Sequence, residues 1–236
     1  LKDVAQKTTQ GNVTGFAMCC LQNEEGTFNF TPWLWSTGAT SYDINNDNGI
    51  KALTLVKDLV DAGSMSKEVI NWTQGDVMNQ FISGNIAMMV NGPWQVPTMR
   101  EQAPDLNWDV TLLPKDAEYA SCLGGENFGV IDGDNVDAAL DFLQFATSKD
   151  EVASYIDDFG YIAARKDVAE GQFTDDETMQ KFTEEMQYAQ PRGPHAQWPE
   201  ISDALSLAVN ESITGTSTPA DAAAKAQSTI DGILAE

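Results

Sequence analysis

The side chains that most often carry out chemistry are scarce or dispersed in this sequence. The single histidine, His195, lies in a proline-rich stretch and cannot by itself form a metal-ligand pattern. Cys19 and Cys20 are adjacent, Cys122 is remote and no C-x-x-C is present, which indicates buried free thiols. Nucleophile-elbow, zinc-protease, Walker and dinucleotide-binding motifs are all missing. We therefore predict no catalytic residue, no metal and no cofactor.

Acidic residues are too numerous to mark a catalytic pair. The sequence has 36 Asp and Glu against 13 Lys and Arg, a net charge of −23. Glu24 and Glu25 border an aromatic block and Glu126 follows a double glycine, and we interpret each as a solvated loop residue. A glycosidase with two carboxylates stays an alternative. The negative charge disfavours nucleic acid and anionic lipid surfaces as partners.

Tryptophans near the ends of predicted elements are the strongest binding candidates. An indole face stacks on the C–H face of a sugar ring, and its N–H serves a hydroxyl. Core packing explains Trp33 and Trp35 equally well. Trp94 is different, because it follows an apolar run through a tight turn, at the sheet edge where α/β proteins place ligands.

Hydrophobic periodicity predicts the elements that position these residues. The expected helices cover residues 48–62, 76–83, 94–102, 135–146, 150–159, 174–189 and 199–210, and a last one begins at Thr218. The expected strands cover residues 13–21, 86–90, 108–113 and 128–131. Strands that alternate with helices indicate an α/β fold with a largely parallel sheet.

The stretch from Phe81 to Trp94, FISGNIAMMVNGPW, resembles the signature of extracellular solute-binding protein family 1. These are the maltose-binding-protein-like receptors of ABC importers. The segments Val110–Lys115, Ala138–Ser148 and Gly160–Arg165 resemble further parts of the family, although Ala163 stands where proline is usual. The resemblance extends through most of the chain.

The resemblance implies a type II periplasmic-binding-protein-like fold, in which two α/β lobes close on a solute about a hinge. It assigns residues 1–112 and 166–236 to the C-terminal lobe. Residues 113–165 would be the interlobe crossing and a returning part of the N-terminal lobe. The first part of that lobe has no counterpart here, so we expect a fragment whose middle segment exposes apolar surface.

By position in the family, Trp94 is the best ligand-stacking candidate. An aromatic block and Trp198 are further ligand-contact candidates, and a Gly-Glu-Asn segment is expected to line the cleft from the other lobe. The block comprises Phe28, Asn29, Phe30 and Trp33, and the segment comprises Gly125, Glu126 and Asn127.

The resemblance implies an extracytoplasmic binding protein that captures a small solute, expected to be a sugar or oligosaccharide, and delivers it to ABC transporter permease subunits. It would be periplasmic or a cell-surface lipoprotein, with any lipid anchor outside this chain. Alternatives are a receptor for polyamine or iron, and a lobe kept only for docking on a permease. Dispersed tyrosines disfavour iron, and acidity spread over the whole chain disfavours polyamine.

Overall fold

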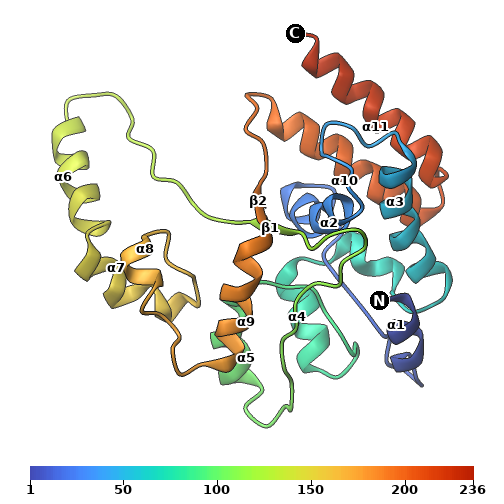
Figure 1. Ribbon diagram of the computed structural model, residues 1–236, viewed down its shortest axis with the longest axis horizontal. Helices are drawn as coiled ribbons and strands as arrows, with labels where there is room; N and C mark the ends of the chain where they lie inside the picture. Colours follow the sequence, from blue (N-terminus) through green and yellow to red (C-terminus); the bar gives the residue numbers. More distant parts are fainter. The chain divides into compact units, whose positions relative to one another are not determined.

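The computed structural model describes all 236 residues, which divide into two compact units (Figure 1). Unit 1 comprises residues 1–91, 112–123 and 185–236, and unit 2 comprises residues 92–111 and 124–184. These limits differ from the predicted lobe boundaries after residues 112 and 165. The assignment of segments to lobes stays a prediction.

Unit 1 is a helical assembly with a small strand pair. Helix α10 (Trp198–Thr214) packs against α2 (Glu24–Ser36), α3 (Asp47–Asp61) and α11 (Pro219–Leu234), as Figure 1 shows. The other elements of this unit are α1 (Lys2–Thr8), η1 (Lys67–Asn71), α4 (Gln74–Ile82), β1 (Ser121–Leu123), η4 (Met186–Tyr188) and β2 (Ala189–Pro191).

The core of unit 1 lies where these helices meet. Leu53 on α3, Phe30 on α2, and Leu205 and Ile201 on α10 are all fully buried. Their spacing places apolar residues on one face of each helix, and burying that face supplies most of the stability that a helix gains in a protein.

Local sequence signals explain where the helices of unit 1 begin and end. The Asn46 side chain accepts hydrogen bonds from the backbone of Asn48 and Gly49 at the start of α3, and Gly63, with φ of 69°, follows its end. A reciprocal Thr73–Asp76 capping box opens α4. The predicted helices over residues 48–62 and 76–83 are thus confirmed, with small shifts at their ends.

Two of the predicted strand segments run side by side in parallel. Residues 13–21 pair with residues 86–90 through bridges from Thr14 to Ile86 and from Ala17 to Met89. The Val90 amide donates to the Ala17 carbonyl at 3.0 Å, and the Ala17 amide donates to Met88 at 2.9 Å. These bridges stay isolated, whereas the only continuous ladder is the short parallel pair of β1 and β2.

The predicted strands over residues 108–113 and 128–131 are wrong. Neither segment has a paired neighbour, and Phe128 and Ile131 are 64% and 90% exposed. An apolar run becomes a strand only when a second strand accepts its backbone hydrogen bonds. The region 28–35, for which the sequence predicted no helix, instead belongs to α2, which contains Pro32.

Unit 2 consists of short helices with little core of its own. Its elements are η2 (Pro93–Gln95), α5 (Val96–Gln102), α6 (Val136–Ala146), α7 (Lys149–Tyr155), η3 (Asp157–Phe159), α8 (Lys166–Ala169) and most of α9 (Glu177–Glu185). A small cluster of Val152, Ala163 and Val168 forms a core, and Arg100 of α5 pairs with Asp176 before α9.

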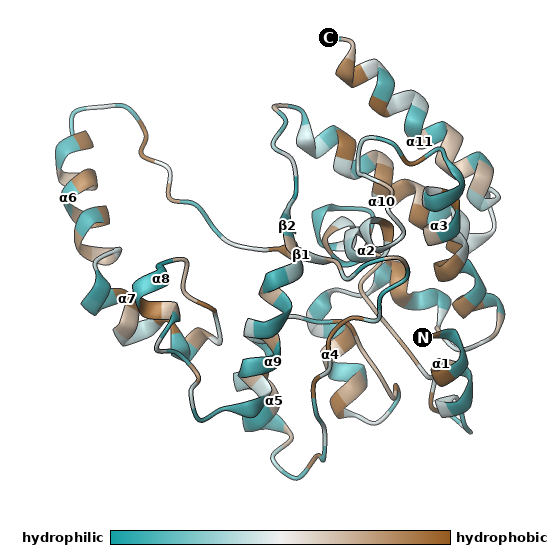
Figure 2. Ribbon diagram, in the orientation of Figure 1, coloured by the Kyte–Doolittle hydropathy of each residue, from teal (hydrophilic) through white to brown (hydrophobic).

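Helix α6 buries none of its residues. Leu140, Phe142 and Phe145 are 51%, 61% and 59% exposed, and Figure 2 shows apolar residues recurring along this helix. The apolar surface expected of residues 113–165 is therefore present. No helix in the chain is both long and apolar enough to cross a membrane.

Candidate functional site

A hollow of about 490 Å³ opens on unit 1 beside the first turns of α2 and α10. Polar and aromatic side chains contributed by segments far apart in the sequence line it. They are Gln22, Asn23, Glu24, Arg192, Trp198, Pro199, Ser202 and Asp203. We call this hollow the α2/α10 pocket.

Trp198 is the aromatic wall of the α2/α10 pocket. It is the first residue of α10, it is half-buried, and its indole Nε1–H donates to the Glu24 carboxylate at 2.9 and 3.1 Å. The Tyr42 ring lies edge-on to the indole, with ring centres 6.4 Å apart. These two contacts hold the ring of a predicted site residue at the edge of the pocket.

Glu24 joins three side chains of the pocket. Besides the indole, its carboxylate accepts a hydrogen bond from the Ser202 hydroxyl and forms an ion pair with Arg192. The Arg192 guanidinium carbon also lies 4.7 Å from the centre of the Phe28 ring, within cation–π range. Glu24 is exposed, as expected of a solvated residue, but it does not lie in a loop, because it opens α2 and contacts three side chains of the pocket.

Three other members of the predicted aromatic block lie inside unit 1. Phe30 is fully buried, Asn29 is 2% exposed and accepts the Cys19 amide at 3.3 Å, and Trp33 is 4% exposed with its ring edge-on to Phe16. The helical path of α2 turns these residues toward the core, while half-buried Phe28 lies beneath Arg192. Their ligand contacts stay a prediction.

Trp94 belongs to unit 2, where it lies in η2 and is half-buried. Its indole lies directly over Gly92: a Cβ atom on that residue would be only 2.1 to 2.3 Å from three ring carbons. Its ring centre is 6.4 Å from that of Tyr161. The absence of a side chain at Gly92 therefore determines where this indole lies.

Gly125, Glu126 and Asn127 are exposed on the connection that follows β1. Gly125 has φ of 148°, a conformation that side-chain-bearing residues rarely adopt. That these three residues line a cleft remains a prediction from the sequence.

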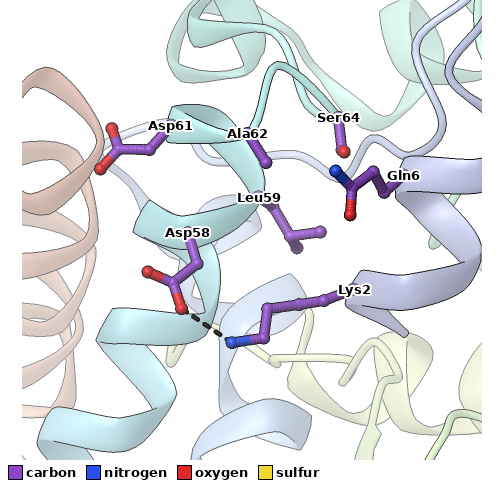
Figure 3. A pocket seen from close by; sticks show the side chains of 7 residues that line it. All are labelled: Lys2, Gln6, Asp58, Leu59, Asp61, Ala62 and Ser64. Atoms are coloured by element: carbon purple, nitrogen blue, oxygen red, sulfur yellow. Dashed lines mark hydrogen bonds and ion pairs between the residues drawn. The ribbon is translucent and has the colours of Figure 1, made fainter.

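A second hollow of about 320 Å³ lies between α1 and the end of α3 (Figure 3). The Lys2 ammonium and the Asp58 carboxylate pair across it at 2.8 Å, and the buried Ser64 hydroxyl has no hydrogen-bond partner. No aromatic side chain lines this hollow. It lacks a stacking surface of the kind that Trp198 gives the α2/α10 pocket.

The thiols lie in surroundings that keep them protonated. Burial raises the pKa of Cys19 to about 12 and raises that of Cys20 well above its usual value. Burial also raises the pKa of Cys122 to about 11. All three are free, and no group of three or more His, Cys, Asp or Glu residues is placed to hold a metal ion.

Residues 1–181 match the family model described as bacterial extracellular solute-binding protein. The chain belongs to this family. A Brucella abortus (strain 2308) protein named as a binding protein is 27% identical over 207 residues, which are 82% of this chain and 50% of that protein. This chain thus spans about half the length of the curated relative it matches.

Solved structures show the same fold. An ABC transporter solute-binding protein from Thermotoga lettingae, bound with α-D-tagatose, is 26% identical with a TM-score of 0.84. The match covers 98% of this chain and 63% of that one. The GacH receptor of Streptomyces glaucescens, solved unliganded and with acarbose, is 25% identical with a TM-score of 0.83. That match covers 100% of this chain and 63% of the GacH chain. The predicted fold class, α/β and periplasmic-binding-protein-like of type II, is confirmed.

Sequence reasoning missed Glu24, Arg192 and Ser202 as pocket residues. One signal was available: Asn23 followed by two glutamates is typical of a helix N-terminus, and Asn23 does cap α2. Nothing local to Arg192 or Ser202 indicates that they meet Glu24, because 168 and 178 residues separate them from it.

Proposed function

We propose that this chain is part of an extracytoplasmic receptor that binds a sugar or oligosaccharide for an ABC importer and does not transform it. The observation that carries the proposal is the Trp198 indole, held by Glu24 and Tyr42 at the edge of the α2/α10 pocket. Membership of the solute-binding family supports it. So do the relatives bound with tagatose and with acarbose.

The chemistry of the pocket suits a neutral polyhydroxylated ligand. The indole offers an apolar face for the C–H face of a sugar ring. The amides of Gln22 and Asn23 and the carboxylate of Asp203 offer hydrogen-bonding groups for hydroxyls. Separately, we propose that Trp94 of unit 2 stacks on ligand, since Gly92 lets its indole take a defined position.

Membership of the solute-binding family also supports proposals for the partners and the location. We propose that the solute-loaded receptor docks on the permease subunits of an ABC transporter. We also propose a periplasmic receptor or a cell-surface lipoprotein, with any lipid anchor outside this chain. Salt extraction and protease accessibility of intact cells test the location.

Isothermal titration of the full-length protein against neutral saccharides, from tagatose to maltotriose, tests the proposal. We expect binding to at least one of them, and a loss of about tenfold or more for Trp198→Ala, because an aromatic stacking contact contributes about 1.5 kcal/mol or more with its buried area. Leu234→Ala, which removes an exposed apolar side chain from α11 outside the pocket, is the control. Two results would refute the proposed function. One is a heat of binding with spermidine or ferric ion together with none for any sugar, and the other is hydrolysis of chromogenic glycosides.

A further inference from the structure

The α2/α10 pocket contains an ion pair that a stacking site does not need. Arg192 is the only cation that lines it, and Glu24 neutralises that cation directly. The side chain of Arg192 is 20% exposed and that of Glu24 is 45% exposed, so the carboxylate is the more accessible of the two. A ligand entering the pocket therefore meets a compensated cation behind an accessible carboxylate.

Arg192 is fixed in place independently of any ligand. Its guanidinium lies against the Phe28 ring at 4.7 Å, and its Nε is buried without a hydrogen-bond partner. A planar guanidinium that stacks on a ring and pairs with a carboxylate has few other rotamers available. Removing the carboxylate would leave the cation in position but without its counter-charge.

Glu24 is fixed equally well. It lies at the first position of α2, where the helix dipole stabilises a negative charge, and its carboxylate accepts hydrogen bonds from Trp198 and Ser202. One side chain thus both orients the stacking indole and cancels the charge of the pocket cation.

We propose that Glu24 is the specificity-determining residue of this pocket, and that it makes the receptor select neutral saccharides over those that carry a carboxylate. The inference rests on the proposed function and specifies its substrate class. A uronate would bring its negative charge close to the Glu24 carboxylate and find Arg192 already paired. A neutral sugar avoids that repulsion and keeps the indole stacking.

The experiment compares the full-length wild type with Glu24→Gln, titrated with maltotriose and with trigalacturonate. We expect the wild type to bind the neutral trisaccharide at least tenfold more tightly. In Glu24→Gln the amide retains hydrogen bonding to the indole, but Arg192 loses its direct ion-pair partner and Asp203 is the one carboxylate left in the pocket. The preference should therefore shift about tenfold toward the uronate, which corresponds to about 1.4 kcal/mol.

Ionic strength separates this electrostatic effect from a change in shape. At about 1 M salt the Debye length falls to about 3 Å, so the uronate gain of Glu24→Gln should shrink while neutral binding stays unchanged. Glu200→Gln is the matched control, because it removes the same charge from the first turn of α10 outside the pocket. Its selectivity should equal that of the wild type.

Arg192→Gln provides a second, opposite test in case Glu24→Gln fails to fold. With Glu24 left uncompensated, the preference should shift toward a cationic chitosan trisaccharide. Equal wild-type affinity for neutral and uronate ligands, or unchanged selectivity in both variants, would overturn this inference and leave the proposed function intact. Failure of every saccharide to bind would overturn both.

Discussion

Replacing Gly92 with alanine should displace the Trp94 indole without straining the backbone. Gly92 has φ of −106° and ψ of 170°, an extended conformation open to alanine. The new Cβ would lie 2.1 Å from Cη2, 2.2 Å from Cζ3 and 2.3 Å from Cζ2 of the indole. Carbon atoms pack at about 3.5–4.0 Å, so the ring has to move by roughly 1.5 Å.

The expected losses of stability and of affinity follow from the displacement of the Trp94 indole. The clashing atoms are at the tip of a side chain, so rotation of the indole relieves the overlap at about 1 kcal/mol, the lower end of the usual cost of overpacking. If Trp94 stacks on the sugar as we propose, sugar affinity should fall by about tenfold, because a stacking contact of about 1.4 kcal/mol would lose its geometry. Ligand-binding calorimetry, tryptophan fluorescence and thermal unfolding together measure these effects.

Gly129→Ala is the control for the change from glycine itself. Gly129 has no atom within 4 Å of an added Cβ, and it lies in the same unit. The Gly129→Ala variant should bind sugar with the affinity of the wild type. If Gly92→Ala left the fluorescence and the affinity of the wild type unchanged, the link between Gly92 and the position of the indole would be refuted.

Three further predictions concern other parts of the chain. The hydrogen bonds from Arg100 lower the pKa of Asp176, so the pair stabilises unit 2 above the unfolded pKa, and that contribution is lost as pH falls through the folded pKa. Asp176→Asn should therefore cost about 1 kcal/mol in urea unfolding at pH 7 and less at pH 2, and equal costs at both pH values would contradict this. Phe30→Ala should reduce the free energy of unfolding by about 3–5 kcal/mol, since the ring is fully buried, and wild-type stability in chemical denaturation would disprove its core position. Cys19 and Cys20 should resist iodoacetamide at pH 8 and react after unfolding, because burial raises both pKa values; rapid labelling of the folded chain, detected by mass spectrometry, would argue against this.

The sequence supported helix prediction better than strand prediction, for a physical reason. The helix over residues 47–61 carries its own signals, namely the Asn46 cap, an apolar face and Gly63 after its end. A strand needs a partner that local sequence does not reveal. Residues 86–90 find one in residues 13–21, whereas the equally apolar residues 128–131 do not.

Sequence alone could predict a pocket residue only where the chemistry of its side chain suggested ligand binding. Trp198 could be proposed from its chemistry alone, and it does line the pocket. Phe30 has the same aromatic character, yet the winding of α2 turns it into the core. Asn23 and the two glutamates after it marked a helix N-terminus, but nothing marked Glu24 as a pocket residue among 36 acidic residues, because its pocket contacts are with residues more than 160 positions away.

The discontinuity of unit 1 has a consequence during synthesis. Thr27 on α2 donates a hydrogen bond to the carbonyl of Ser202 on α10, 175 residues later. At about 5–20 residues per second, a ribosome needs roughly 9–35 s to make the intervening chain. The faces of α2 and α3 that α10 covers stay exposed for about that time, so the nascent chain presents a long-lived target for chaperones before it can fold.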